Sequence, residues 1–175
     1  LREKYPRKPL VLLAFDESEI KRIDFIKRKI FDEIFIWSGN ANIFPAIIKC
    51  IEDEKNISKD IKTADVRLII LIEDTPKYYS MILPNLYKEI IFNTKHLINK
   101  SLNDSQKLLH MRGRPKILIA TNYEEAVKLF KRYRLNVLGI ITDLKFTRKN
   151  KIDQNAGLKL IQYIRKTDLS MPILV

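Results

Sequence analysis

Acidic residues directly follow two apolar segments of this chain. Glu73 and Asp74 come after LIILI, and Asp143 comes after VLGIIT. Uninterrupted apolar runs of this length fit parallel strands that helices cover on both faces, and ligands of such sheets bind just beyond the carboxyl ends of the strands. We therefore expect the three carboxylates to lie at one edge of a sheet, although each acid taken alone could also cap the next helix.

Three carboxylates in one place repel one another unless a cation joins them. Oxygen ligands suit a hard ion such as Mg²⁺. A doublet after one strand and a single Asp after another favour a shared site over three unrelated helix caps. The residues therefore predict a magnesium site formed by Glu73, Asp74 and Asp143.

Strands and helices must alternate along the chain to position these acids. Short apolar runs predict strands over residues 9–15, 33–38, 68–72, 116–121, 137–142 and 172–175. Apolar residues at three- and four-residue spacing predict helices over residues 17–30, 43–54, 77–111, 123–133 and 156–166. The alternation predicts an α/β fold of three layers, in which a parallel sheet lies between helices on both faces.

The predicted helix over residues 77–111 is unusually long. A helix of some 30 residues is about 45 Å long, which is more than a small domain can cover. It must therefore find a partner, such as a second copy of the chain in a homodimer, or break near the cap-like triplet at 103–105. Residues 53–65 are polar and aperiodic, so we interpret 57–65 as a linker between two units. Residues 145–155 predict a polar, basic loop.

The composition is that of a globular protein. The chain has 175 residues, of which 46% are hydrophobic, and a formal net charge of +12. Such a charge invites a nucleic-acid interpretation. Lys and Arg are interleaved with Asp and Glu, however, and the chain carries no recognisable nucleic-acid-binding motif, which argues against that class of partner. The single cysteine, Cys50, excludes an intrachain disulfide and is expected to be a buried, inert thiol.

No apolar run approaches the roughly 20 residues that span a bilayer, and the first residues lack the hydrophobic segment of a signal peptide. We therefore expect no membrane contact and a cytoplasmic location. The chain begins with Leu1 and stops at Val175 within an apolar strand, so we expect it to be a piece of a larger protein.

From Val66 onward the chain resembles a response-regulator receiver domain, the flavodoxin-like module of phosphorelay signalling. The pair Glu73-Asp74 matches the acidic pair of that family, and Asp143 matches its phosphoacceptor. Residues 156–165 and 171–174 resemble the third helix and fourth strand of a receiver. The resemblance implies a two-component system in which Asp143 takes a phosphoryl group from a histidine kinase or a phosphotransfer protein. It also implies that Mg²⁺ is bound by the three acids and the backbone carbonyl of Lys145.

Residues 1–56 resemble strand 4 to helix 5 of a second, degenerate receiver. Ala14 stands where a receiver has Ser or Thr, and Trp37-Ser38-Gly39 stands where it has Lys-Pro. The chain thus resembles the back half of one receiver, a linker over 57–65, and the front two-thirds of another over 66–175. Whether the two partial units complete one sheet is left open by the sequence.

The stretches LLAFDESE and LIEDTPKYYS also resemble the receiver-like region of large proteins of the phosphoenolpyruvate synthase or pyruvate phosphate dikinase type. In that case the catalysis lies elsewhere in the parent, and this piece is a regulatory module that contacts other domains of the parent rather than an enzyme.

Two alternatives are open. The first is a pseudo-receiver, a phosphorylation-independent scaffold that dimerises through residues 77–111. The second is a phosphatase of the haloacid-dehalogenase type, which also places Asp after a first strand. That family needs an Asp-x-Asp pattern, whereas Thr75 and Pro76 follow Asp74 here.

Overall fold

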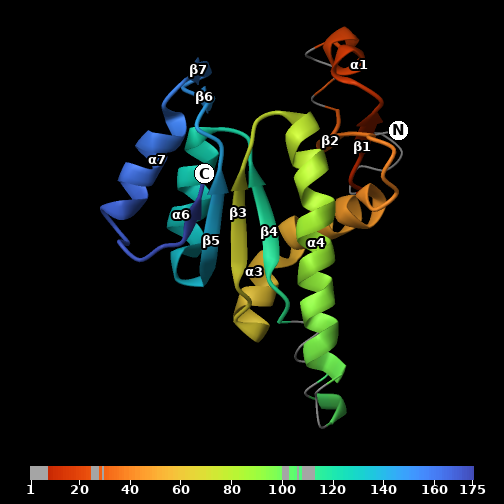
Figure 1. The fold of residues 1–175 in the computed structure, drawn as a ribbon, viewed down its shortest axis with the longest axis vertical. Coiled ribbons are helices and arrows are strands. Elements are labelled where there is room, and N and C mark those ends of the chain that lie inside the picture. Colours follow the sequence, from red (N-terminus) through yellow and green to blue (C-terminus); the bar gives the residue numbers. More distant parts are fainter. Residues whose placement is uncertain (1–7, 25–27, 29, 100–102, 106, 108–112) are drawn as a thin grey trace.

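A computed structural model describes residues 8–24, 28, 30–99, 103–105, 107 and 113–175. Its centre is a four-stranded parallel sheet in the order β4-β3-β5-β8 (Figure 1). The strands are β3 (Leu68–Ile72), β4 (Lys116–Ala120), β5 (Val137–Thr142) and β8 (Ile173–Leu174). The main helices are α3 (Ile43–Ala64), α4 (Pro76–Asn99), α6 (Tyr123–Tyr133) and α7 (Ala156–Arg165).

The sheet lies between two apolar layers because alternate strand residues face opposite sides. In β3, Leu68, Ile70 and Ile72 are buried in a core that includes side chains of α6 and α7. Leu71 faces the other way, into a core with side chains of α3 and α4. These two cores confirm the predicted three-layer α/β fold with a parallel sheet.

The order of the four strands is that of the flavodoxin-like class, in which the first strand lies between the second and the third. Here β3 is the first strand along the chain within this sheet, and it lies between β4 and β5. The chain therefore places β4 on one side of β3 and then returns to place β5 on the other side. The carboxyl ends of these two strands carry the acids singled out in the sequence.

The first strands of the chain form a separate parallel pair. β1 (Val11–Ala14) and β2 (Glu33–Ile36) pair with each other, with α1 (Glu17–Arg22) in the connection. In the part of the chain that the structure describes, they do not join the four-stranded sheet. The question left open by the sequence is thereby answered for these residues: the two parts share a core without completing one sheet.

Helix α4 connects this strand pair to the rest of the molecule. Ser80 accepts a hydrogen bond from the backbone N–H of Ile36 at 2.9 Å, and the Tyr79 hydroxyl donates to the carbonyl of Ile34. The Tyr79 ring also meets the ring of Phe35 edge to face, with centroids 5.5 Å apart. Phe35 belongs to the same buried cluster as Leu71 of β3. The amino-terminal half of α4 therefore packs against both sheets.

A buried ion cluster ties α3 to the start of β4. Asp53 is fully buried and accepts hydrogen bonds from Arg114 at 2.6 Å, from the Tyr87 hydroxyl at 3.0 Å and from the backbone N–H of Ile117 at 3.0 Å. The ammonium group of Lys116 lies 3.7 Å from the same carboxylate. A buried charge needs such partners, because desolvation without them is costly.

Residues 57–65, which we predicted as a linker from their polar, aperiodic sequence, are mostly helical, because α3 continues to Ala64. Ile57 is buried in the main core, with Ile61 and Ala64 packed beside it. Asp65 ends the helix in the left-handed conformation, at φ 43°. The helix therefore crosses from one core to the other instead of leaving a solvent-exposed connection.

Three further predicted segments differ from the structure or lie partly outside the described residues. Residues 145–155 are not only loop, since β6 (Phe146–Arg148) and β7 (Lys151–Asp153) form an antiparallel hairpin. Helix α4 is described from Pro76 to Asn99, and residues 100–102, 106 and 108–112 of the predicted 77–111 helix lie outside the described residues. α1 ends at Arg22, and residues 25–27 and 29 of the predicted 17–30 helix also lie outside them.

Candidate functional site

The acids that follow β3 and β5 lie at one edge of the sheet. Ile72 pairs with Thr142 in the strand register, so Glu73 and Asp143 leave the sheet side by side. The backbone N–H of Asp143 donates to the carbonyl of Ile72 at 3.1 Å, and the N–H of Glu73 donates to the carbonyl of Ala120 at 3.1 Å. The predicted shared edge is therefore present, at the point where flavodoxin-like sheets bind their ligands.

The three carboxylates differ in exposure and in hydrogen bonding. Glu73 is buried and accepts from the backbone N–H of Thr75 at 2.9 Å. Asp74 is half-buried and accepts from the backbone N–H and the hydroxyl of Thr147, at 3.0 and 3.1 Å. Asp143 is exposed, and one of its oxygens accepts from the N–H of Leu144 at 2.6 Å. Of the three, Asp143 is the carboxylate that an incoming group can reach most freely.

The pKa of Glu73 reflects its burial and the nearby carboxylates of Asp74 and Asp143. Burial raises the pKa of Glu73 above its ordinary value, and hydrogen bonds from Thr75 oppose that rise. The negative charges of Asp143 and Asp74 raise the pKa further. A cation at this edge would lower the pKa again, because it would favour the charged carboxylates.

The β6–β7 hairpin covers part of the acidic edge. Besides the two bonds from Thr147 to Asp74, the N–H of Lys149 donates to the side chain of Glu124 at 3.1 Å. The guanidinium of Arg148 lies over the ring of Tyr123, 4.8 Å from its centroid. The hairpin is thus attached to the segment that follows β3 and to α6. Its hydroxyl and backbone donors hold Asp74 where a metal ligand was predicted.

The helix after the hairpin supports the loop that carries Asp143. The N–H of Gly157, in the first turn of α7, donates to the carbonyl of Leu144 at 3.0 Å. The hydroxyl of the buried Thr142 donates to the carbonyl of Asp143 at 2.9 Å. Sequence reasoning missed Thr142 and Thr147 as parts of the site.

The predicted magnesium ligands are near one another without forming a ready cage. Carboxylate oxygens of Glu73 and Asp143 have the chemistry that Mg²⁺ prefers. Asp74 is directed to Thr147, and Lys145 is exposed in the turn between β5 and β6. Among the described residues, no three His, Cys, Asp or Glu side chains are arranged to hold a metal ion. Both oxygens of Asp74 already accept hydrogen bonds, Oδ2 from Thr147 and Oδ1 from the Thr75 hydroxyl at 3.3 Å, so a bound Mg²⁺ would share these oxygens with those donors or displace them.

The positions that depart from the receiver pattern lie in the other strand pair. Ala14 is the last residue of β1, and its carbonyl accepts the N–H of Trp37 at 2.7 Å. The Trp37 ring packs against Phe44, with centroids 5.3 Å apart. Because β1 and β2 are not strands of the central sheet, these residues belong to a separate strand end.

Cys50 is buried, and burial raises the pKa of its thiol, as expected of an inert cysteine. Within the described ranges, no helix combines the length and the apolar character that crossing a bilayer requires.

Comparison of this chain with protein-family models, with curated proteins and with solved structures found no match.

Proposed function

We propose that this chain is a regulatory, receiver-like phosphoacceptor module in which Asp143 accepts a phosphoryl group. The observation that carries the proposal is the pairing of an exposed Asp143 with a buried Glu73 at the carboxyl ends of adjacent parallel strands. The donor would be a histidine kinase, a phosphotransfer protein or a small acyl phosphate. A cytoplasmic location fits such a donor.

The chemistry asks little of the protein beyond position and charge. A carboxylate oxygen of Asp143 attacks phosphorus, and the bond from phosphorus to the donor nitrogen or oxygen breaks, which leaves an aspartyl phosphate. Glu73 and Asp74, with the carbonyl of Lys145, are the groups that would hold Mg²⁺. That ion supplies positive charge to the phosphoryl oxygens. The exposed position of Asp143 allows in-line approach of the donor.

One observation favours a second candidate, the pseudo-receiver scaffold. Asp74 accepts two hydrogen bonds from Thr147, so part of the acidic edge is engaged by the protein itself. A scaffold would regulate through association, either as a homodimer through residues 77–111 or with other domains of a parent protein. It would not respond to a phosphoryl donor.

Acetyl phosphate with Mg²⁺ distinguishes the two functions. We expect the intact mass of the wild-type chain to rise by about 80 Da, the mass of one phosphoryl group. Asp143→Asn should abolish the rise. Asp104→Asn, at an exposed aspartate in a helical turn after α4, is the matched control and should retain it.

Two outcomes reject the phosphoacceptor proposal. A wild-type chain that shows no mass change, and no Mg²⁺-dependent binding of beryllofluoride, behaves as a scaffold. A mass increase that persists in Asp143→Asn shows that another residue is the acceptor.

A further inference from the structure

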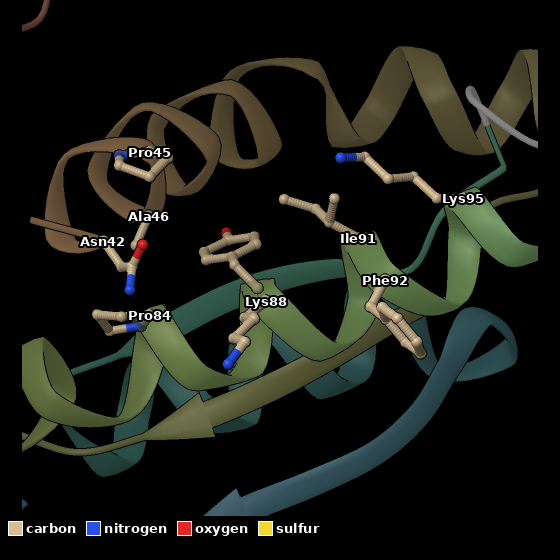
Figure 2. A pocket seen from close by; sticks show the side chains of 9 residues that line it. Asn42, Pro45, Ala46, Pro84, Lys88, Ile91, Phe92 and Lys95 are labelled. Carbon is tan, nitrogen blue, oxygen red and sulfur yellow. The ribbon is translucent and has the colours of Figure 1, made fainter.

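A groove lies between the start of α3 and the middle of α4, away from the acidic edge. Its volume is about 290 Å³. Figure 2 shows Pro45 and Ala46 on α3 across from Pro84 and Ile91 on α4. Small-molecule sites typically measure about 300–1,000 Å³. The groove is at the small end of that range and is large enough for a few side chains of a protein partner.

The floor of the groove is apolar and fixed. Ala46, Pro84 and Tyr87 are buried, and the hydroxyl of Tyr87 donates to the buried carboxylate of Asp53 at 3.0 Å. At the rim the side chain of Phe92 is 66% exposed. An exposed aromatic side chain beside a preformed apolar floor is typical of a protein-binding surface.

The charge of the groove has one sign. Lys88 and Lys95 both line it, and both are exposed. They are seven residues apart on α4, so two helical turns, or about 10.5 Å, separate them along the axis. Among the residues that the structure describes, no acidic side chain lines the groove. Neither lysine forms an ion pair with any residue that the structure describes.

We propose that this groove binds an acidic amphipathic helix of a partner protein. Apolar side chains of that helix enter between α3 and α4 and cover Phe92. Carboxylates seven residues apart on the partner then meet Lys88 and Lys95, since helices that pack nearly parallel keep the same axial spacing. The apolar floor supplies affinity, and the two lysines select acidic over basic partners.

A second copy of the chain fits this surface poorly. In a two-fold symmetric contact the same patch meets itself, so Lys88 and Lys95 of one copy would face the lysines of the other. Like charges placed together in this way are unfavourable. The chain as a whole also carries a formal charge of +12, which favours encounter with an acidic partner.

The test is fluorescence anisotropy of the full chain with two labelled amphipathic peptides of about 18 residues, or five helical turns. One peptide carries Glu beside its apolar stripe, and the other carries Lys at the same positions. We expect the acidic peptide to bind and the basic one not to bind. Lys88→Glu/Lys95→Glu should weaken binding of the acidic peptide about tenfold or more and should allow the basic peptide to bind.

Matched variants separate the groove from general charge. Lys62→Glu/Lys77→Glu makes the same change in charge at exposed positions outside the groove and should leave the affinity unchanged. Phe92→Ala removes the exposed ring without a change in charge and should weaken binding several-fold. Circular dichroism should show that each variant keeps the fold, since all five side chains are exposed.

Three results would overturn the proposal. The first is the absence of binding of the acidic peptide at about 1 mM. The second is an equal loss of affinity in Lys62→Glu/Lys77→Glu. The third is an unchanged affinity in Phe92→Ala, which would reduce the interaction to charge alone.

Discussion

Gly157 lies against the main chain of Asp143 with no room for a side chain between them. A Cβ placed on Gly157 would be 2.3 Å from the carbonyl oxygen of Asp143 and 2.9 Å from the Cα of Leu144. Real Cβ atoms do not approach other heavy atoms so closely, so the α7 helix and the loop of the candidate phosphoacceptor can keep this distance only with glycine here. The position of Asp143 therefore depends on a residue fourteen positions later in the chain.

Gly157→Ala should displace the loop that carries Asp143. Because the obstructing atoms belong to the backbone, they cannot rotate away, and we expect a loss of about 1–3 kcal/mol in the free energy of unfolding. Under the proposed function the rate of phosphorylation by acetyl phosphate should fall as well. Gly39→Ala is a control for backbone strain without a steric clash. A Cβ at Gly39 meets nothing within 4 Å, and only the φ of 83° opposes the substitution. Equal phosphorylation rates in Gly157→Ala and the wild type would contradict the expected displacement.

Thr147→Val should remove one of the two hydrogen bonds that Thr147 donates to Asp74. The substitution keeps the shape of the side chain and removes the hydroxyl that lies 3.1 Å from the carboxylate. We expect stability to fall by about 1 kcal/mol, and the affinity for Mg²⁺, followed by isothermal titration calorimetry, to rise because Asp74 becomes available. Thr63→Val, at an exposed threonine bonded to its own helix, is the matched control. A decrease in Mg²⁺ affinity would show that Thr147 supports the metal site instead of competing with it.

Asp53→Asn should be severely destabilising. The substitution removes the negative charge that Arg114 and Lys116 share in the buried cluster. Breaking a buried ion pair on one side typically costs about 3–5 kcal/mol, because the other charge is left without compensation. The measurement is urea denaturation. Asp60→Asn on the same helix, which removes a more exposed partner of Lys116, should cost clearly less. Similar losses in the two variants would refute the special role of burial.

A second cavity places several acids together and predicts a pH dependence. It has a volume of about 260 Å³ and is lined by Asp32, Glu33, Glu54 and Glu125 together with residues of β4. Burial raises the pKa of Glu33 to about 7, and the charges of Glu54, Glu125 and Asp32 contribute to the rise. Between the ordinary value of 4.5 and about 7, the folded chain therefore binds more protons at Glu33 than the unfolded chain does.

The free energy of unfolding should consequently fall as the pH rises from 4.5 through 7. We expect Glu33 to contribute about 1–3 kcal/mol to this fall, because each pKa unit is worth about 1.4 kcal/mol. Glu33→Gln should flatten the profile of stability against pH, as measured by urea denaturation at each pH. Glu89→Gln, at an exposed position of α4, should leave the slope unaltered. A slope that Glu33→Gln does not change would place the titrating group elsewhere.

Elements with their own local signals were predictable from the sequence. The helix 123–133 and the strand 137–142 have the predicted bounds. At the start of α6, Asn122 accepts from the N–H of Glu125 at 2.8 Å, and Glu125 accepts from the N–H of Thr121 at 2.8 Å. The residues of such a reciprocal cap are only three or four positions apart, so the cap can be recognised from a short stretch of sequence.

The rest depended on contacts between distant residues. Along 57–64 the helical signal was limited to Ile57, Ile61 and Ala64, because the remaining residues of that stretch are polar. The strands of the hairpin are three residues long, too short to show a period, although Lys149 and Asn150 at φ 51° and 59° form its turn. Thr147 and Asp74 are 73 residues apart in the chain, so no local pattern predicted their contact. The common location of the acids at the strand ends was predictable, because a parallel sheet has the carboxyl ends of its strands at one edge.

Because α4 packs against both sheets, cleavage of the chain between the two strand groups would expose parts of the core. A cut near residue 65 leaves one product with the unprotected side chains of Tyr79, Leu83 and Tyr87 and the other with that of Phe35, all of which are buried in the intact chain. The cut also separates the carboxylate of Asp53, on one product, from the guanidinium of Arg114, on the other. Neither product keeps a complete hydrophobic core, so we expect residues on the two sides of position 65 to unfold together as one cooperative unit.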